Sequence, residues 1–171
     1  QNLRVPNPLA LNLYVLGKDN NGALSKLNRA VKENLKIYLS QYRILTDAIN
    51  IKDGFIINIA VKFRIIALRN FNKREVVLRC IDRLKQFFDI NKWQFNQPIF
   101  ISDIQRELYG VEGVQGVISV DIENKFSEAD GYSGNIYDIT QARIDDIVYP
   151  SLDTSIFEVK FPNRDIEGSC V

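Results

Sequence analysis

The residue types that carry most acid–base and metal chemistry are scarce in this chain. It contains no His, which is the side chain most used for proton transfer near neutral pH and the commonest metal ligand. Carboxylates are numerous, but the adjacent Asp145 and Asp146 would point to opposite faces of a strand, which argues against a shared acid–base role. The sequence therefore predicts a protein that is not an enzyme, with no catalytic residues, no cofactor and no small-molecule substrate.

The two cysteines and one acidic turn give no metal-binding pattern. Cys80 lies in a helical pattern and Cys170 near the end of the chain, and neither has a second ligand at the usual spacing. The turn KDNNG at residues 18–22 places its Asp, Asn and Gly at offsets that do not match an EF-hand. We predict no metal site, a buried Cys80 and a free thiol at Cys170, a usage typical of a reducing cytoplasm.

A glycine-rich run at residues 110–116 has the composition of a phosphate-binding loop but not its order. A phosphate cradle follows a strand and opens a helix, whereas this run follows a helical pattern and opens a strand. Its spacing is neither G-x-G-x-x-G nor a P-loop. We predict a turn into a strand at residues 117–123, with Ile118, Val120 and Ile122 facing the core.

Nucleic-acid binding is the alternative function that the sequence leaves open. Arg74, Arg79, Arg83 and Lys85 form a basic ridge on a predicted helix, which is either a solvated face or a phosphate-binding one. The net charge is only +1, so no global field draws the chain to nucleic acid or to an anionic membrane. We predict neither partner, and keep a ferredoxin-like nucleic-acid-binding module as the alternative.

The stretch that organises the predicted fold is residues 54–68. From Phe55 its apolar residues fall on every second position, while Asn58, Lys62 and Arg64 share the other parity, as in a strand with one buried face. The side chains on the same face as Asn58, Lys62 and Arg64 include no aromatic ring on which a nucleic-acid base could stack. Residues 48–52 predict a short strand before it, joined through Asp53-Gly54 by a hairpin turn or continuous with it through a bulge.

Three helices are predicted around this strand. Apolar residues at steps of three and four predict a helix over residues 24–42 with Ser25 as its N-cap, and a second over 76–88 capped by Asn72. A short third helix begins with Ser102 as its cap and ends at Gly110.

The order of these elements predicts the fold class. Strand, helix, hairpin pair, helix, insertion and strand give an α+β, two-layer, mostly antiparallel sheet with two main helices on one face, the ferredoxin-like β-α-β-β-α-β arrangement. Residues 1–125 are expected to form the core domain. Residues 126–171 have too few apolar residues for a core of their own, and are expected to form a loop and a C-terminal β arm that packs on the core or on a neighbouring subunit.

The aromatic connector at residues 89–101 and the arm together supply the candidate protein–protein interface. For Trp93 the simpler reading is packing over the end of the second helix. The candidate interface residues are Trp93, Phe95, Ile99, Phe100, Tyr149, Leu152, Ile156, Phe157, Val159 and Phe161.

The most apolar stretch is well short of the roughly 20 residues that a membrane helix needs, so no membrane span is predicted.

The chain has no Met, even at position 1, from which we expect a segment of a longer protein.

Three separated blocks of the sequence resemble the C-terminal part of the baseplate wedge subunit of T4-like contractile-tailed bacteriophages, within the broader baseplate J-like family. They are VKENLKIYLSQYRILTDAINIKDGFIINI at residues 31–59, FDINKWQFNQPI at 88–99 and YPSLDTSIFEVKFP at 149–162. The blocks occur in the order of the family, and residues 110–117 are similar to the same region.

The resemblance implies a structural protein of the virion tail baseplate, assembled in the host cytoplasm. In that family, copies of the wedge subunit pair with one another and with other baseplate wedge proteins to build a ring around the central hub. The ring widens on host contact and so releases sheath contraction. The implied partners are a second copy, as a dimer, and other wedge proteins, and the family has no catalytic residues to transfer.

Overall fold

A computed structural model describes residues 10–42 and 48–171 of the 171-residue chain. These residues form a mixed α+β structure with several sheets. The chain separates into two compact units, Gln1–Gly54 and Phe55–Val171, which we call unit 1 and unit 2. The division therefore falls between residues 54 and 55, and does not coincide with the predicted boundary at residue 125.

Unit 1 is built on a pair of parallel strands, β1 (Ala10–Val15) and β4 (Ala48–Asp53), connected through α1 (Arg29–Ser40). The short strands β2 (Gly17–Lys18) and β3 (Leu24–Ser25) pair antiparallel. The turn between them is held by Asp19, whose Oδ1 accepts the backbone N–H groups of Asn21 and Ala23. The turn that the sequence predicts at residues 18–22 is confirmed.

The first helix is shorter than predicted and begins at a different cap. Its N-cap is Asn28, whose side chain accepts the N–H of Val31 at 2.8 Å, and not Ser25, which lies in β3. Asn is as good an N-cap as Ser. The strand at β3 removes the first turn that the apolar spacing predicts.

The predicted hairpin before the central strand is wrong. β4 pairs with β1, and β5 (Phe55–Ala67) begins two residues later in a different sheet. A two-residue hairpin turn needs positive φ at one or both central residues, and Gly54 is not among the residues with positive φ. Because β1 pairs only with β4 among the described strands, the strand order of the ferredoxin-like fold is not observed.

The sheet of unit 2 is centred on the thirteen-residue strand β5. On one side β7 (Val114–Asn124) pairs antiparallel with it, from Ile59↔Asn124 to Ala67↔Val114. On the other side β10 (Ser155–Glu158) and β11 (Ile166–Cys170) pair parallel with its first and second halves. The C-terminal segment is therefore part of the main sheet, whose pairings are mixed.

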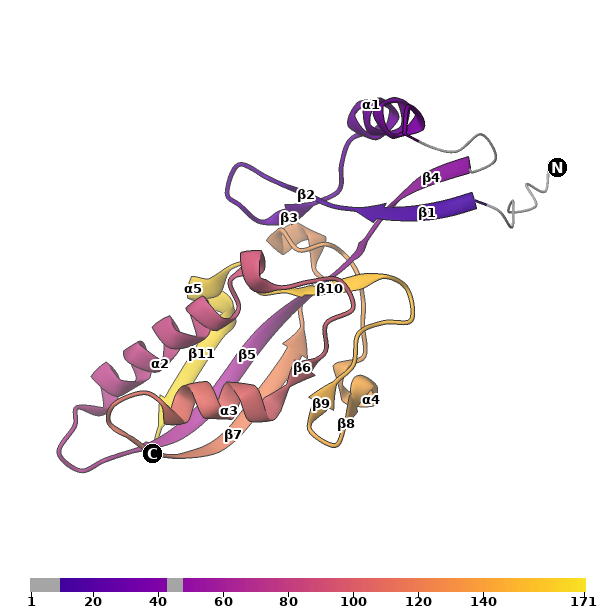
Figure 1. Cartoon of the computed structure of the whole chain (residues 1–171). Helices are drawn as coiled ribbons and strands as arrows, with labels where there is room; N and C mark the ends of the chain where they lie inside the picture. The colour runs from indigo at the N-terminus through magenta and orange to yellow at the C-terminus, as the bar shows by residue number, and fades with distance from the viewer. Residues whose placement is uncertain (1–9, 43–47) are drawn as a thin grey trace. The chain divides into compact units, whose positions relative to one another are not determined.

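One helical layer covers this sheet. Helices α2 (Lys73–Phe87) and α3 (Ile101–Tyr109) lie on the same face, α2 over β11 and α3 over β7 (Figure 1). Within unit 2 two helices therefore lie on one face of the sheet, and they are α2 and α3. Together with β5 these helices bury Val61, Phe63, Ile65, Val76, Cys80, Leu84, Ile101, Ile104 and Leu108.

The ends of both helices can be compared with the predicted caps. The side chain of Asn72 accepts the N–H of Arg74 at 3.0 Å, which confirms the predicted cap of α2. Helix α3 ends at Gly110 as predicted, but it begins at Ile101 without a side-chain cap, so Ser102 lies inside it.

Strand β7 departs from strict alternation. The pairing shifts register between Arg64 and Ile65: Ser119 lies opposite Arg64 and Val117 opposite Ile65, which leaves Ile118 as an extra residue. An extra residue in one strand places its side chain on the face opposite to the one that strict alternation along the sequence predicts. Ile118 is accordingly exposed and its predicted core position is wrong, whereas Val120 is buried as predicted.

A second, small sheet of unit 2 consists of β6 (Ile99–Phe100), β9 (Ile147–Val148) and β8 (Arg143–Ile144), paired antiparallel in that order. Helix α4 (Ile139–Ala142) leads into it, and α5 (Pro162–Asp165) connects β10 to β11. Single turns of 3₁₀-helix lie at Ile90–Lys92 and Glu128–Asp130. In the described ranges, no helix combines the length and the apolar character needed to cross a membrane.

Candidate docking surface

Trp93 anchors the aromatic connector to the end of α2. Its ring stacks on Phe88 with a centroid separation of 5.5 Å, and meets Phe87 edge-on. Its Nε1 donates a hydrogen bond to the carbonyl oxygen of Phe87 at 3.1 Å. Trp93 is buried, so the predicted packing over this helix is confirmed and its ring is used within the chain.

Several candidate interface residues are covered by the chain itself. β10 lies in register with the start of β5, with Ile156 opposite Ile56 and Phe157 opposite Ile57. Both faces of this part of the sheet are covered, so side chains of either parity are buried. Trp93, Ile99, Ile156, Phe157 and Val159 are buried, whereas Phe95 and Phe161 are half-buried. We therefore correct the candidate list: the five buried residues stabilise this chain and are not offered to a partner.

The remaining candidates gather around the small sheet. β6 pairs with β9, with Phe100 opposite Ile147, so the aromatic connector and the middle of the arm lie side by side. Phe100 in β6, Tyr149 just after β9 and Leu152 in the following loop are exposed, and Leu152 has essentially no cover. Exposed Ile144 in β8 adds a fourth apolar side chain. We call Phe100, Ile144, Tyr149 and Leu152 the docking surface.

The sequence analysis missed Ile144. The signal was present in the run RIDDIV, in which two acidic residues separate Ile144 from the apolar pair Ile147-Val148. Asp145 and Asp146 have φ of 51° and 61° and form the turn between β8 and β9. Asp is one of the few non-glycine residues that tolerates this left-handed conformation.

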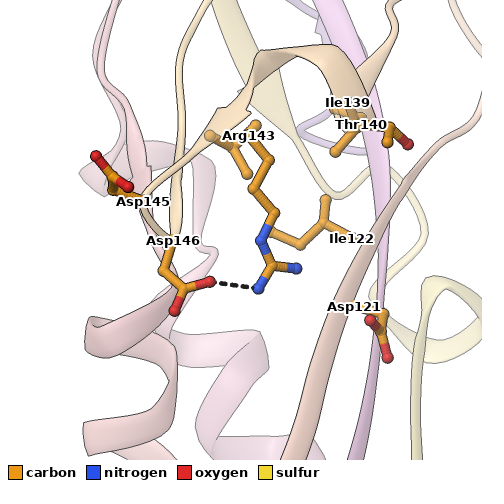
Figure 2. A pocket seen from close by; sticks show the side chains of 8 residues that line it. Asp121, Ile122, Ile139, Thr140, Arg143, Asp145 and Asp146 are labelled. Carbon is orange, nitrogen blue, oxygen red and sulfur yellow. Dashed lines mark hydrogen bonds and ion pairs between the residues drawn. The ribbon is translucent and has the colours of Figure 1, made fainter.

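A recess of about 580 Å³ lies beside this turn. Arg143 points into it and forms an ion pair with Asp146, Asp121 of β7 lies on the opposite wall, and the Asp145 side chain points away from Arg143 (Figure 2). The recess is open, and its charges are carboxylates with a single guanidinium that is already paired. It adds acidic character to the edge of the docking surface.

Phe100 also borders a second recess, of about 430 Å³, between α2 and α3. Its apolar lining consists of Phe87, Trp93, Pro98 and Phe100, and charged residues surround it. Phe100 is the exposed aromatic side chain of this lining, whereas Trp93 is buried against the end of α2.

The position of Tyr149 is fixed by its neighbour Tyr137. The Tyr137 hydroxyl donates a hydrogen bond to the backbone carbonyl oxygen of Tyr149 at 2.6 Å. Burial raises the pKa of Tyr137, so the phenol remains protonated and able to donate at neutral pH. The loop that carries Tyr149 is therefore held in place at its start.

The basic ridge is largely neutralised by carboxylates. Arg79 pairs with Glu75, Arg83 pairs with Glu107 at 2.6 Å, and Lys85 pairs with Asp82 at 3.3 Å. Cations held in such pairs offer less charge to a phosphate backbone. The ridge therefore has the character of a solvated face, the first of the two readings given by the sequence.

Within the described parts of the chain, no group of three or more His, Cys, Asp or Glu side chains is placed to hold an ion. The buried carboxylate of Asp165 is used structurally, because it accepts hydrogen bonds from the Tyr132 hydroxyl at 2.6 Å and from the Phe161 N–H at 3.2 Å.

Comparison of the chain with models of protein families gave no match, and comparison with curated protein sequences gave none either.

Proposed function

We propose that this chain is a structural component of a phage tail baseplate wedge, which acts by binding other protein subunits. Its partners are further copies of itself and other wedge proteins, assembled in the ring around the tail hub that controls sheath contraction. The docking surface on unit 2 is the part of the chain that makes such contacts.

The pairing of β6 with β9 is the observation that carries this proposal. Single exposed apolar side chains are normal on any protein, but several around one small element are typical of a protein interaction site. Here Phe100, Ile144, Tyr149 and Leu152 are exposed on or next to one three-stranded sheet. Two of the three sequence blocks that resemble the wedge family border this sheet, since one ends at Ile99 in β6 and the other begins at Tyr149 just after β9, which supports the same function.

The nucleic-acid alternative has less support. It depends on the basic ridge, where Arg79, Arg83 and Lys85 each pair with a neighbouring carboxylate. A single function is therefore proposed.

Sedimentation velocity of the chain over a range of concentrations tests the proposal. We expect the wild-type chain to associate, and Leu152→Asp to weaken association by about tenfold or more, because a charge replaces an apolar side chain at the contact. Leu78→Asp is the matched control, since Leu78 is exposed on the outer side of α2. It should leave association unchanged.

Circular dichroism of each variant checks that the fold is retained. A chain that stays monomeric at every concentration, and that binds no other wedge protein when mixed with them, would contradict the proposed function. Equal effects of Leu152→Asp and Leu78→Asp would contradict the assignment of the docking surface.

A further inference from the structure

Unit 1 has almost no core of its own. Helix α1 has no buried residue, and in unit 1 the buried described residues are Leu24 and Gly54. Its main sheet is a single pair of parallel strands. Parallel sheets are normally covered on both faces, and a two-stranded sheet is marginally stable by itself.

Apolar side chains of unit 1 are correspondingly exposed. Val31, Ile37 and Tyr38 of α1 are exposed, as are Tyr42 beyond its end and Leu11 in β1. The sequence predicts an apolar stripe on this helix, and its own unit covers little of it. These side chains are open to contact with a further surface.

The charge of unit 1 indicates what kind of surface this is. Residues 1–54 contain eight Lys and Arg against four Asp and Glu, whereas residues 55–171 contain 14 against 17. The asymmetry is strongest in residues 117–171, with four basic and eleven acidic side chains. The chain therefore combines a basic unit 1 with an acidic C-terminal third, and these opposite charges nearly cancel in its net charge.

The basic charge gathers in one recess. It has a volume of about 550 Å³ and lies between α1 and β4, and its charged lining consists of Arg29, Lys32, Lys36 and Lys52 with one carboxylate, Glu33. Lys32 pairs with Asp53 at 2.7 Å. No ion pair of Arg29, Lys36 or Lys52 is found in the part of the chain that the structure describes. These cations are available to an acidic partner.

The docking surface has the complementary character. Exposed Asp145 lies next to Ile144, and exposed Asp153 lies next to Leu152. Neither carboxylate has an ion-pair partner within the described residues, in contrast to Asp146, which pairs with Arg143 (Figure 2). Each acidic group thus lies beside an exposed apolar side chain, and in unit 1 the cation Lys36 likewise precedes the exposed Ile37.

We infer that unit 1 of one copy binds the docking surface of a second copy, with the α1–β4 recess receiving the acidic side chains around Asp145 and Asp153. This inference rests on the proposed function and names the partner of the same site. Because the contact joins two different surfaces, each copy offers both of them, so that copies can associate reciprocally as a closed pair or in series as a ring or an open chain.

A double-mutant cycle on the full chain tests this contact. Lys36→Gln with Lys52→Gln removes two cations, and Asp145→Asn with Asp153→Asn removes two carboxylates without disturbing the left-handed backbone at residue 145. Each pair of substitutions should weaken self-association by roughly tenfold, as expected for two surface ion pairs. The four substitutions together should weaken it no further than either pair alone, because each pair already removes the interaction.

Lys26→Gln with Asp130→Asn is the matched control, since both residues are exposed and lie outside these surfaces. It should leave association unchanged, and added salt should weaken the wild-type contact more than that of the neutralised variants. Additive effects of the two pairs, or no effect of either, would overturn this inference. If Leu152→Asp still weakened association in that case, the proposed function would stand; a chain that forms no contact under any condition would contradict both.

Discussion

At the scale of single residues, Gly168 allows the ring of Phe63 to pack against the last strand, β11. Gly168 lies opposite Phe63 in the β5–β11 pairing, and the Phe63 ring occupies the space where a side chain at residue 168 would begin. A glycine inside a strand often marks such a close approach. This strand was not predictable from local pattern, because IEGSC has little apolar alternation.

Gly168→Ala tests this packing. The added methyl group should collide with the Phe63 ring and lower the free energy of unfolding by about 1–3 kcal/mol, measured by urea denaturation. Gly116→Ala is the matched control in β7, because nothing lies within 4 Å of a Cβ at that position. Equal stability of the two variants would contradict the arrangement of Phe63 over β11.

Cys80 provides a residue-scale prediction about pH. Burial, with a smaller contribution from Cys170, raises the pKa of its thiol from 9.0 to about 11. The folded chain therefore holds this proton more tightly than the unfolded chain. The stabilisation that this thiol provides is fully present below about pH 9 and is lost as the pH rises toward about 11.

Urea denaturation of the wild type and of Cys80→Ala at about pH 8 and about pH 10 measures this effect. The difference in unfolding free energy between the two proteins should shrink at the higher pH. A difference that grows with pH would contradict a buried, protonated thiol.

At the scale of elements, α5 connects two strands that follow one another along the same edge of β5. Its buried Asp165 accepts the hydroxyl of Tyr132, and the Arg164 guanidinium lies over the Phe161 ring at 4.4 Å from the centroid. Tyr132 thus links the loop of residues 125–135 to the turn between β10 and β11. Burial, followed by the Asp165 carboxylate, raises the pKa of Tyr132, which keeps the phenol a donor.

Tyr132→Phe should lower the free energy of unfolding by about 1–3 kcal/mol, because a buried carboxylate loses a hydrogen bond. Tyr109→Phe is the control, since Tyr109 is exposed. Thermal or urea unfolding of both variants measures the effect. A Tyr132→Phe protein as stable as the control would show that this link does not hold the connection in place.

The elements with strong local patterns were predictable from the sequence. The alternation in residues 55–67, the cap of α2 and the glycine that ends α3 all act within a few residues, so β5, α2 and α3 could be assigned. Pairing partners could not be assigned, because β10 and β11 contact β5 from about 100 residues away in the chain. The same long-range pairing explains why Ile156 and Phe157, correctly predicted as a strand, are core residues and not interface residues.

The candidate site was predictable in part for the same reason. Phe100, Tyr149 and Leu152 were chosen for aromatic and apolar character without a local core, and they are exposed. Ile144 and Asp145 lie in a stretch whose local pattern is mixed, and only the pairing of β8 with β9 gives them a role. The uncovered state of α1 was not predictable, because its apolar stripe is typical of a helix packed on a sheet.

At the scale of the whole molecule, the two units differ in how well each is supported by its own contacts. Unit 2 has a helical layer over a mixed sheet and a continuous core, whereas unit 1 has almost no buried side chains. Regions with few buried contacts open most readily. A chain that acts by binding other subunits can use such a unit, because the partner supplies the missing cover.

Hydrogen–deuterium exchange of the full chain at low and at high concentration tests this account most directly. We predict that the backbone amides of α1 and of residues 144–153 gain protection as the chain associates, while those of β5 remain equally protected throughout. Exchange that is identical at all concentrations, in a chain whose mass remains that of a single copy, would contradict the claim that this protein works by docking onto other subunits.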